Sequence, residues 1–421
     1  MSARLHRLSN GVRVVCDPSR EHQTFALSLV VDGGSRWEDE GRAGWSHLLE
    51  HMVFKGAGGR DSRALVEDVE SVGGSVNAAT GFERTSYQVR ALAGSVPLAV
   101  EVVSDLVLRP TLDADELERE KNVVAQELAE ADDAPDDKVF DLAQGAAFAG
   151  QALGRPILGT TESVGRATRA ALSDWRRLLY SPDRIVVSAA GAVDEDELLA
   201  CVERAFAGVE RAGHVEPSGA ATFTGGVVQE TRKLEQAHFV LLLPGAAVGG
   251  DDYYAGRVFA EALGGGMASR LFQEAREKRG LAYAVDAYAD NYADVGLTGV
   301  YAGAGAADGA ALLRLVAEQV RDLAERPTQA EVARAKVQMK SGLFMARESL
   351  LSRAEQAAAQ VLLFDRLYGP EELAAEIDAV TPEDVRRFGE GVLAPGKAAV
   401  AVLGSKRATA AAPVFAQALF G

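Results

Sequence analysis

Cysteine is nearly absent from this 421-residue sequence, which contains only Cys16 and Cys201. The two lie far apart and form no CxxC pattern, so they provide neither a disulfide framework nor a thiolate zinc site within one motif. Long apolar runs are missing as well. The start, MSARLHRLSNGVRVV, lacks the roughly 7–15 apolar residues of a signal peptide, and no segment approaches the ~18–20 apolar residues of a membrane span. We therefore expect a cytoplasmic protein.

An excess of basic residues is also missing. The chain has 44 Lys and Arg against 61 Asp and Glu, a formal net charge of −17. A nucleic-acid-binding protein would need a basic face, so this balance argues against that class of function. The composition, with 48% hydrophobic and 25% charged residues, is that of a globular protein. The length predicts at least two domains.

Runs of β-branched and apolar residues alternate along the chain with long helical patterns, which together predict an α+β fold. The clearest helical patterns cover residues 98–108, 115–131 and 310–324. The expected strands lie at residues 12–16, 25–31, 75–87, 185–192, 238–243, 283–288, 296–301 and 398–403.

The two halves of the sequence contain similar segments. LRPTLDADELEREK begins at residue 108 and ERPTQAEVARAK at 325, while LSDWRR begins at 172 and PEDVRR at 382. The offsets, 325 − 108 = 217 and 382 − 172 = 210, are too long for a solenoid repeat and fit duplicated domains. Residues 211–226 are rich in Gly, Pro, Ser and Thr and predict a linker. We expect domains at residues 1–210 and 227–421.

The chemistry is concentrated in GWSHLLEHMVFKG, residues 44–56, which has the pattern of a buried helix. His47 and His51 are four apart and project from one helical face, and Glu50 lies beside both. Burying these groups is costly unless a partner such as a divalent metal satisfies them. HxxEH is a peptidase signature, and with six histidines in the chain it should arise by chance on the order of once in a hundred such sequences. The alternative is a pair of core histidines hydrogen-bonded to each other and to Glu50.

A third ligand is expected from elsewhere, because a catalytic zinc usually takes three protein ligands and a water. The helix predicted at residues 115–131 begins with a capping pattern, Asp113-x-x-Glu116. Glu120, Val124 and Glu127 then share one face. Periodicity alone does not choose between Glu120 and Glu127.

These residues resemble the pitrilysin-type zinc metallopeptidases, or inverzincins, particularly the small branch that includes the mitochondrial processing peptidase β-subunit and its bacterial relatives. The similarity runs from LSNGVRVV to LGSK at residues 403–406. In that family a glutamate follows the second histidine by about 76 positions, within an E-x6-E pair, and here 127 − 51 = 76. The resemblance implies one Zn²⁺ per chain on His47, His51 and Glu127, with Glu120 supporting and Glu50 as general base.

The resemblance extends into the second half at residues 264–285. Relatives carry an arginine and a tyrosine seven apart that point into the zinc site, and Arg276 and Tyr283 have this spacing. Residues 74–87 resemble the family's substrate strand, where Asn77 and Ala78 would bind an extended peptide by β-augmentation. The second half has no HxxEH motif. The implied fold is two homologous domains, each a mostly antiparallel sheet with packed helices, closing like a clam around a chamber. A homodimer is expected.

The sequence therefore predicts a zinc endopeptidase that cleaves unfolded, possibly basic, peptides. One alternative is a non-catalytic or partner-dependent assembly subunit, although such relatives lose zinc ligands or the catalytic glutamate that this sequence retains. A zinc enzyme acting on a small metabolite is a second alternative. A closed structural site is the third, but it would need a fourth protein ligand.

Overall fold

The computed structural model describes residues 3–212, 217 and 219–421, so the predicted linker at 211–226 lies partly outside the described residues. The chain forms two compact units, and each unit is assembled from three segments of the sequence. The first unit comprises residues 1–128, 156–219 and 344–369, and the second comprises 129–155, 220–343 and 370–421.

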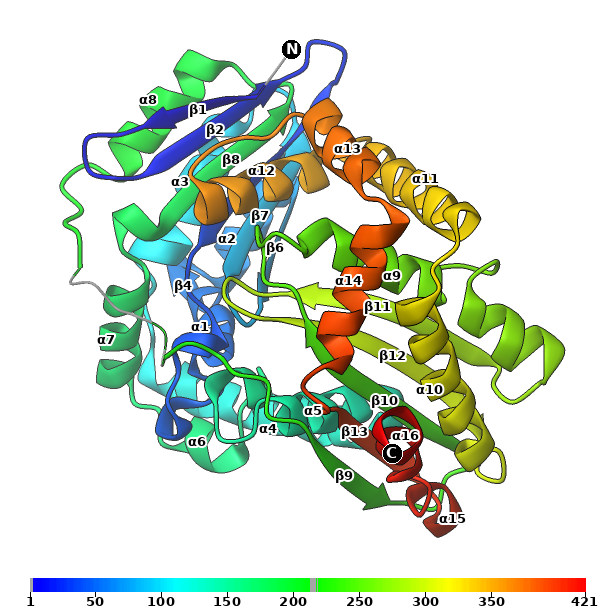
Figure 1. Ribbon diagram of the computed structural model, residues 1–421. Helices are drawn as coiled ribbons and strands as arrows, with labels where there is room; N and C mark the ends of the chain where they lie inside the picture. The colour runs from blue at the N-terminus through cyan, green and yellow to red at the C-terminus, as the bar shows by residue number, and fades with distance from the viewer. Residues whose placement is uncertain (1–2, 213–216, 218) are drawn as a thin grey trace. The chain divides into compact units, whose positions relative to one another are not determined.

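The first unit is built on a six-stranded sheet of order β1-β2-β8-β3-β7-β6 (Figure 1). β2 and β8 pair in parallel, and all other neighbours pair antiparallel. Its strands are β1 (Arg4–Arg7), β2 (Arg13–Pro18), β3 (Thr24–Val31), β6 (Ser75–Thr80), β7 (Thr85–Leu92) and β8 (Ile185–Gly191), with a small ribbon of β4 (Gly56–Ala57) and β5 (Arg60–Asp61) beside it.

The second unit contains a five-stranded sheet of order β11-β12-β10-β13-β9. Taken in chain order, these strands repeat the arrangement of β2, β3, β6, β7 and β8, and the single parallel pair, β9 with β13, recurs at the equivalent place. This repeated topology confirms the expected α+β fold of two similar, mostly antiparallel domains. The strands are β9 (Gly226–Thr231), β10 (Gln236–Gly245), β11 (Ala284–Asn291), β12 (Gly296–Gly305) and β13 (Ala399–Gly404).

Helices cover both faces of the central strands in the first unit. β3 is buried along nearly its whole length, because α3 packs on one face and α12 on the other. The edge strand β6 is instead alternately exposed and half-buried. The helices are α1 (Trp45–Val53), α2 (Ser62–Ser71), α3 (Val96–Leu108), α6 (Thr161–Gly165), α7 (Arg169–Leu179), α8 (Glu195–Ala205) and α12 (Leu350–Phe364).

The helices of the second unit surround its sheet in a similar way, and a π-helix, η5 (Phe272–Lys278), precedes β11. The chain passes between the units within α4 (Ala114–Asp133) and again within α11 (Gln329–Ala346). The other helices are α5 (Pro135–Ala147), α9 (Tyr253–Gly264), α10 (Gly309–Glu325), α13 (Pro370–Ala379), α14 (Pro382–Leu393), α15 (Lys406–Thr409) and α16 (Val414–Phe420).

One helix of each half belongs to the sheet of the other half. α12, from the second half of the sequence, packs on β3 and β8, whereas α5, from the first half, packs on β13 and β10. The compact units therefore differ from the sequence ranges 1–210 and 227–421 in these two exchanged segments. Among the described helices, none is both long and apolar enough to cross a membrane.

Candidate metal centre

The histidines of the HxxEH motif lie on α1, one helical turn apart. Leu48, Leu49 and Met52 occupy the opposite face and are completely buried in the core of the first unit. The helix starts at Gly44, whose φ of +85° is a conformation that other residues rarely adopt. A Cβ at this position would lie 2.5 Å from the carbonyl oxygen of Leu158. The sequence predicted a helix here with both histidines on one face, and the structure has this helix at Trp45–Val53.

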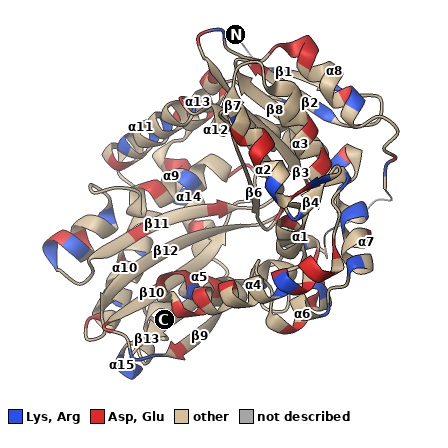
Figure 2. Ribbon diagram, turned by 180° about the vertical axis from the view of Figure 1, so that it is seen from behind, with Lys and Arg blue, Asp and Glu red and all other residues tan. Residues whose placement is uncertain are grey.

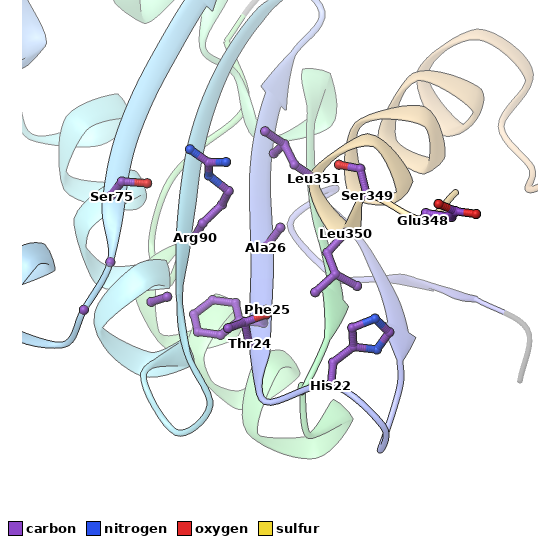
Figure 3. A pocket seen from close by; sticks show the side chains of 13 residues that line it. His22, Thr24, Phe25, Ala26, Ser75, Arg90, Glu348, Ser349, Leu350 and Leu351 are labelled. Atoms are coloured by element: carbon purple, nitrogen blue, oxygen red, sulfur yellow. The ribbon is translucent and has the colours of Figure 1, made fainter. Parts of the chain in front are cut away.

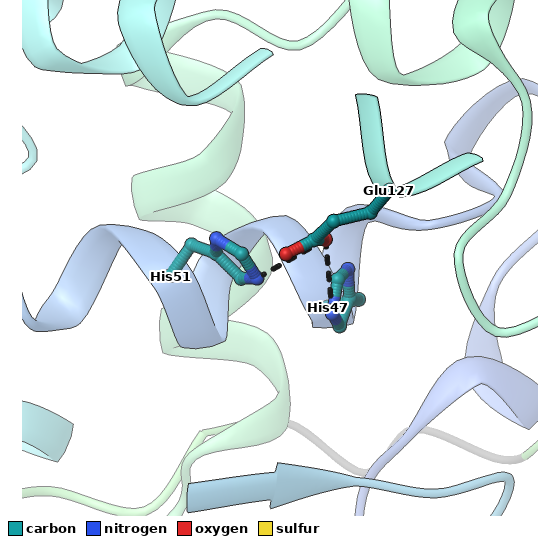
Figure 4. Close-up of side chains that lie close together, drawn as sticks. All are labelled: His47, His51 and Glu127. Atoms are coloured by element: carbon teal, nitrogen blue, oxygen red, sulfur yellow. Dashed lines mark ion pairs between the residues drawn. The ribbon is translucent and has the colours of Figure 1, made fainter. Parts of the chain in front are cut away.

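Glu127, on α4, lies against both histidines (Figure 4). Its Oε2 is 3.5 Å from His51 Nε2 and 3.9 Å from His47 Nε2. The two imidazole rings are 4.6 Å apart between centroids, nearly edge to face. The structure therefore brings together the three side chains that the resemblance selected as ligands.

The three side chains fit a bound metal ion. Their candidate ligand atoms all lie within 4.8 Å of one another. Two atoms that each bind one zinc at about 2.1 Å are no more than about 4.2 Å apart, and both distances to Glu127 satisfy this limit. Among the described residues, the buried Oε2 of Glu127 has no hydrogen-bond partner. A cation would satisfy this otherwise costly carboxylate oxygen.

Protonation favours metal binding at His47. Burial, followed by the neighbouring His51, lowers the pKa of His47 to about 4. The imidazole is therefore neutral at physiological pH, and the neutral form is the one that ligates metals.

A second carboxylate holds His51 from behind. Glu120 is only 5% exposed, and its Oε2 is 3.1 Å from Nδ1 of His51. Its other oxygen pairs with Lys55 Nζ at 2.6 Å. Because Nδ1 of His51 is engaged by Glu120, Nε2 is the nitrogen that faces Glu127. The structure thus separates the two glutamates that periodicity left equivalent.

Glu50 completes the group on the same helix. The hydroxyl of Thr80, at the end of β6, donates a hydrogen bond to Glu50 Oε2. Burial raises the pKa of Glu50, while this hydrogen bond and the charge of His51 oppose the rise. The raised pKa makes the carboxylate a stronger base than an exposed glutamate.

The other predicted residues lie on two elements. Asn77 and Ala78 are on the edge strand β6, where Ala78 packs against the core and Asn77 is exposed. Arg276 lies in η5, and the Cζ atom of its guanidinium is 4.8 Å from the centroid of the Phe272 ring. Tyr283 precedes β11 and is 45% exposed. Arg276 and Tyr283 belong to the second unit, and their approach to the metal ligands stays a prediction.

A cavity of about 520 Å³ lies at the start of β6, at the other end of the strand from Thr80 (Figure 3). It is bounded by the first residues of β3 and β6, the end of β7 and the start of α12. The side chain of Arg90 lines it and makes no hydrogen bond or ion pair with another described residue. Figure 3 shows Glu348, on the far wall, directed away from Arg90.

Sequence reasoning missed three residues of this region: Lys55, Thr80 and Glu38. Lys55 follows His51 by four residues, a helical spacing that could have revealed it. Thr80 and Glu38 reach α1 from other segments, and local sequence carries little sign of such contacts.

Comparison with known proteins identifies the family. Residues 13–161 match the model of "Insulinase (Peptidase family M16)", and residues 166–339 match "Peptidase M16 inactive domain". The chain belongs to peptidase family M16. The predicted resemblance to pitrilysin-type metallopeptidases is thereby confirmed.

Several similar proteins are named zinc proteases. An "uncharacterized zinc protease" of Streptomyces coelicolor is 34% identical over 418 residues, covering 96% of this chain and 90% of the relative. The "uncharacterized zinc protease YmxG" of Bacillus subtilis is 35% identical over 377 residues, covering 89% and 92%.

Two solved structures share the fold of this chain. A protease from Helicobacter pylori has a TM-score of 0.89 at 21% identity and covers 96% of this chain and 99% of its own. A peptidase M16 inactive domain from Pseudomonas fluorescens has a TM-score of 0.88, also at 21% identity, covering 96% and 98%.

Proposed function

We propose that this protein is a zinc-dependent endopeptidase. The observation that carries the proposal is the convergence of His47 Nε2, His51 Nε2 and Glu127 Oε2 beside the half-buried carboxylate of Glu50. Three protein ligands leave a position for water, as in catalytic rather than structural zinc sites. The names of the relatives agree with this assignment.

The chemistry divides between the ion and the chain. A zinc ion bound by these ligands would lower the pKa of a water toward about 7 and polarise the substrate carbonyl. Glu50 accepts a proton from the attacking water as its oxygen adds to the carbonyl carbon. It then returns that proton to the nitrogen of the leaving amine as the C–N bond breaks. Thr80 keeps Glu50 oriented through its hydrogen bond.

The substrate in this proposal is an extended peptide that pairs with β6. This strand is at the edge of the sheet, and Thr80 at its end touches Glu50. Main-chain pairing at Asn77 and Ala78 would bind peptides with little sequence demand. Acidic residues recur along α4 and α5 (Figure 2) and, with the net charge of −17, favour basic peptides.

The remaining features of the proposal rest on the family resemblance. Arg276 and Tyr283 would stabilise the developing oxyanion as donors, and the two domains would form a chamber that admits unfolded chains. By the same resemblance the protein would act as a homodimer. The two cysteines, far apart and in no CxxC pattern, fit a location in the reducing cytoplasm. The alternative within the family is a partner-dependent or non-catalytic assembly subunit. The complete set of His47, Glu50, His51 and Glu127 favours the peptidase.

The test compares wild type, Glu50→Gln and Glu70→Gln on a fluorogenic peptide library, with the zinc content of each protein determined. Glu70 is exposed on α2, so its variant controls for loss of one negative charge. We expect about one zinc in all three, and a loss of cleavage of about 10²–10⁴-fold in Glu50→Gln alone. Wild-type cleavage by Glu50→Gln would refute the general base. Zinc without cleavage by wild type would favour the assembly subunit.

A further inference from the structure

The start of α1 is capped by a residue that lies outside the helix. The N-cap residue, Gly44, has no side chain with which to bind the unpaired N–H groups of the first turn. Glu38 does so instead. Its Oε2 accepts a hydrogen bond from Gly44 N at 2.8 Å, and its Oε1 accepts one from Ser46 N at 2.6 Å.

This contact is short and buried. Glu38 is only 1% exposed, and a carboxylate at the N-terminus of a helix is stabilised by the helix dipole. Hydrogen bonds from N–H groups to an ionised carboxylate are about twice as strong as neutral ones. Two further bonds hold the same turn: Trp45 Nε1 donates to the carbonyl oxygen of Ser163 at 2.9 Å, and Trp175 Nε1 donates to Ser46 Oγ at 3.3 Å.

The two histidines are secured differently. His51 is held through its side chain, because Glu120 engages its Nδ1. Nδ1 of His47 is buried and has no hydrogen-bond partner among the described residues. His47 directly follows Ser46, so it lies in the turn that Glu38 caps. The position of its imidazole therefore depends on the backbone of that turn.

We propose that Glu38 is a positioning residue for the metal centre, fixing His47 through the first turn of α1 in the way that Glu120 fixes His51 through its side chain. The inference rests on the proposed zinc site. It does not depend on the cleavage of any substrate.

The central variant is Glu38→Gln, which keeps the size of the side chain but leaves only one acceptor oxygen for two N–H donors. The matched control is Asp39→Asn, the adjacent carboxylate, which is more than half exposed and caps η2 (Glu40–Arg42) rather than α1. Zinc affinity is measured by competition with a chromogenic chelator. Backbone amide exchange is measured on the zinc-free proteins.

We expect Glu38→Gln to weaken zinc binding about tenfold, the lower end of effects seen when a supporting partner of a ligand is removed. Amide exchange should accelerate at Ser46 and His47 but not at the far end of α1, and Asp39→Asn should change neither quantity. In a His47→Ala background, Glu38→Gln should cause no further loss of affinity, because the ligand that it positions is already gone.

Wild-type zinc affinity in Glu38→Gln would overturn the proposal. An equal loss in the wild-type and His47→Ala backgrounds would do the same, because it would reveal a general structural role. If Glu38→Gln does not fold, Glu38→Asp retains the charge on a shorter side chain, and the proposal then requires a smaller loss confined to the His47-containing protein. A wild-type protein that binds no zinc would refute the zinc site itself.

Discussion

Glu120 offers a measurable test of how the metal site is supported. Its carboxylate is 5% exposed, lies 3.1 Å from His51 Nδ1 and pairs with Lys55. In Glu120→Gln the amide oxygen can still accept from Nδ1, but the bond is no longer charge-assisted and loses about half its strength. Glu120→Ala removes the acceptor altogether. Loss of such a partner typically costs 10–100-fold in metal affinity, or about 1.4–2.7 kcal/mol, so we expect Gln at the lower end and Ala at the upper.

Competition titration with a zinc-binding dye at fixed pH measures these affinities without substrate. Glu118→Gln is the matched control, since Glu118 lies on the same helix, two residues away, and is 70% exposed. It should bind zinc as wild type does. If Glu120→Ala also bound zinc with wild-type affinity, the contact with His51 would contribute nothing to the site and the argument would be wrong.

Three further predictions concern other parts of the chain. Burial would raise the pKa of Glu331, but hydrogen bonds from Arg270 and Thr328 hold this pKa at about 2, well below the ordinary value of 4.5. This depressed pKa stabilises the fold above pH 4.5, and about 2 kcal/mol of the free energy of unfolding is lost by pH 3. The free energy of unfolding measured in urea should therefore depend less on pH in Glu331→Gln than in wild type. The same pH dependence in both proteins would contradict the ion pair. Leu49→Ala, at a fully buried position, should lower the free energy of unfolding of the zinc-free protein by about 2–5 kcal/mol, and a loss below about 1 kcal/mol would be inconsistent with the packing. The cavity lined by Arg90 lies at the far end of β6 from Thr80, about five residues or ~17 Å along a peptide paired with this strand. Whatever the overall charge of the peptide, an acidic side chain at that one position would meet Arg90, so Arg90→Ala should lower kcat/KM for such a peptide by up to about fivefold relative to one with a neutral residue there; no relative change would exclude the cavity as a subsite.

The helix that carries the histidines could be predicted because its chemistry is local. A four-residue spacing places His47 and His51 on one face whatever surrounds them. Helical spacing could not show which of Glu120 and Glu127 is the metal ligand, since both lie on one face of α4. The distinction depends on the two nitrogens of His51: Glu120 meets Nδ1 and Glu127 meets Nε2. Only the family spacing, and then the geometry, resolves them.

Contacts between segments that are distant in the sequence could not be predicted from it. Thr80 donates a hydrogen bond to Glu50, 30 residues earlier in the chain. The first turn of α1 is capped by Glu38, from the segment before the helix, whereas the side chain of the N-cap residue is the usual cap. A glycine at the N-cap signals only that a partner is needed, without saying which one. The halves at residues 1–210 and 227–421 were likewise inferred from similar segments, and nothing in those segments reveals that α5 and α12 change places.

The exchange of α5 and α12 limits how such a chain can arise and be divided. In a half-length ancestor, the helix that covers the sheet would have come from a second copy of the chain. Duplication and fusion would then have converted this contact between two molecules into a contact within one chain. For the same reason, either half produced alone should expose the apolar sheet face that the missing helix covers. Mixing the two halves should cover the exposed sheet face of each half again. A protease cut near residue 212 should leave the two halves associated.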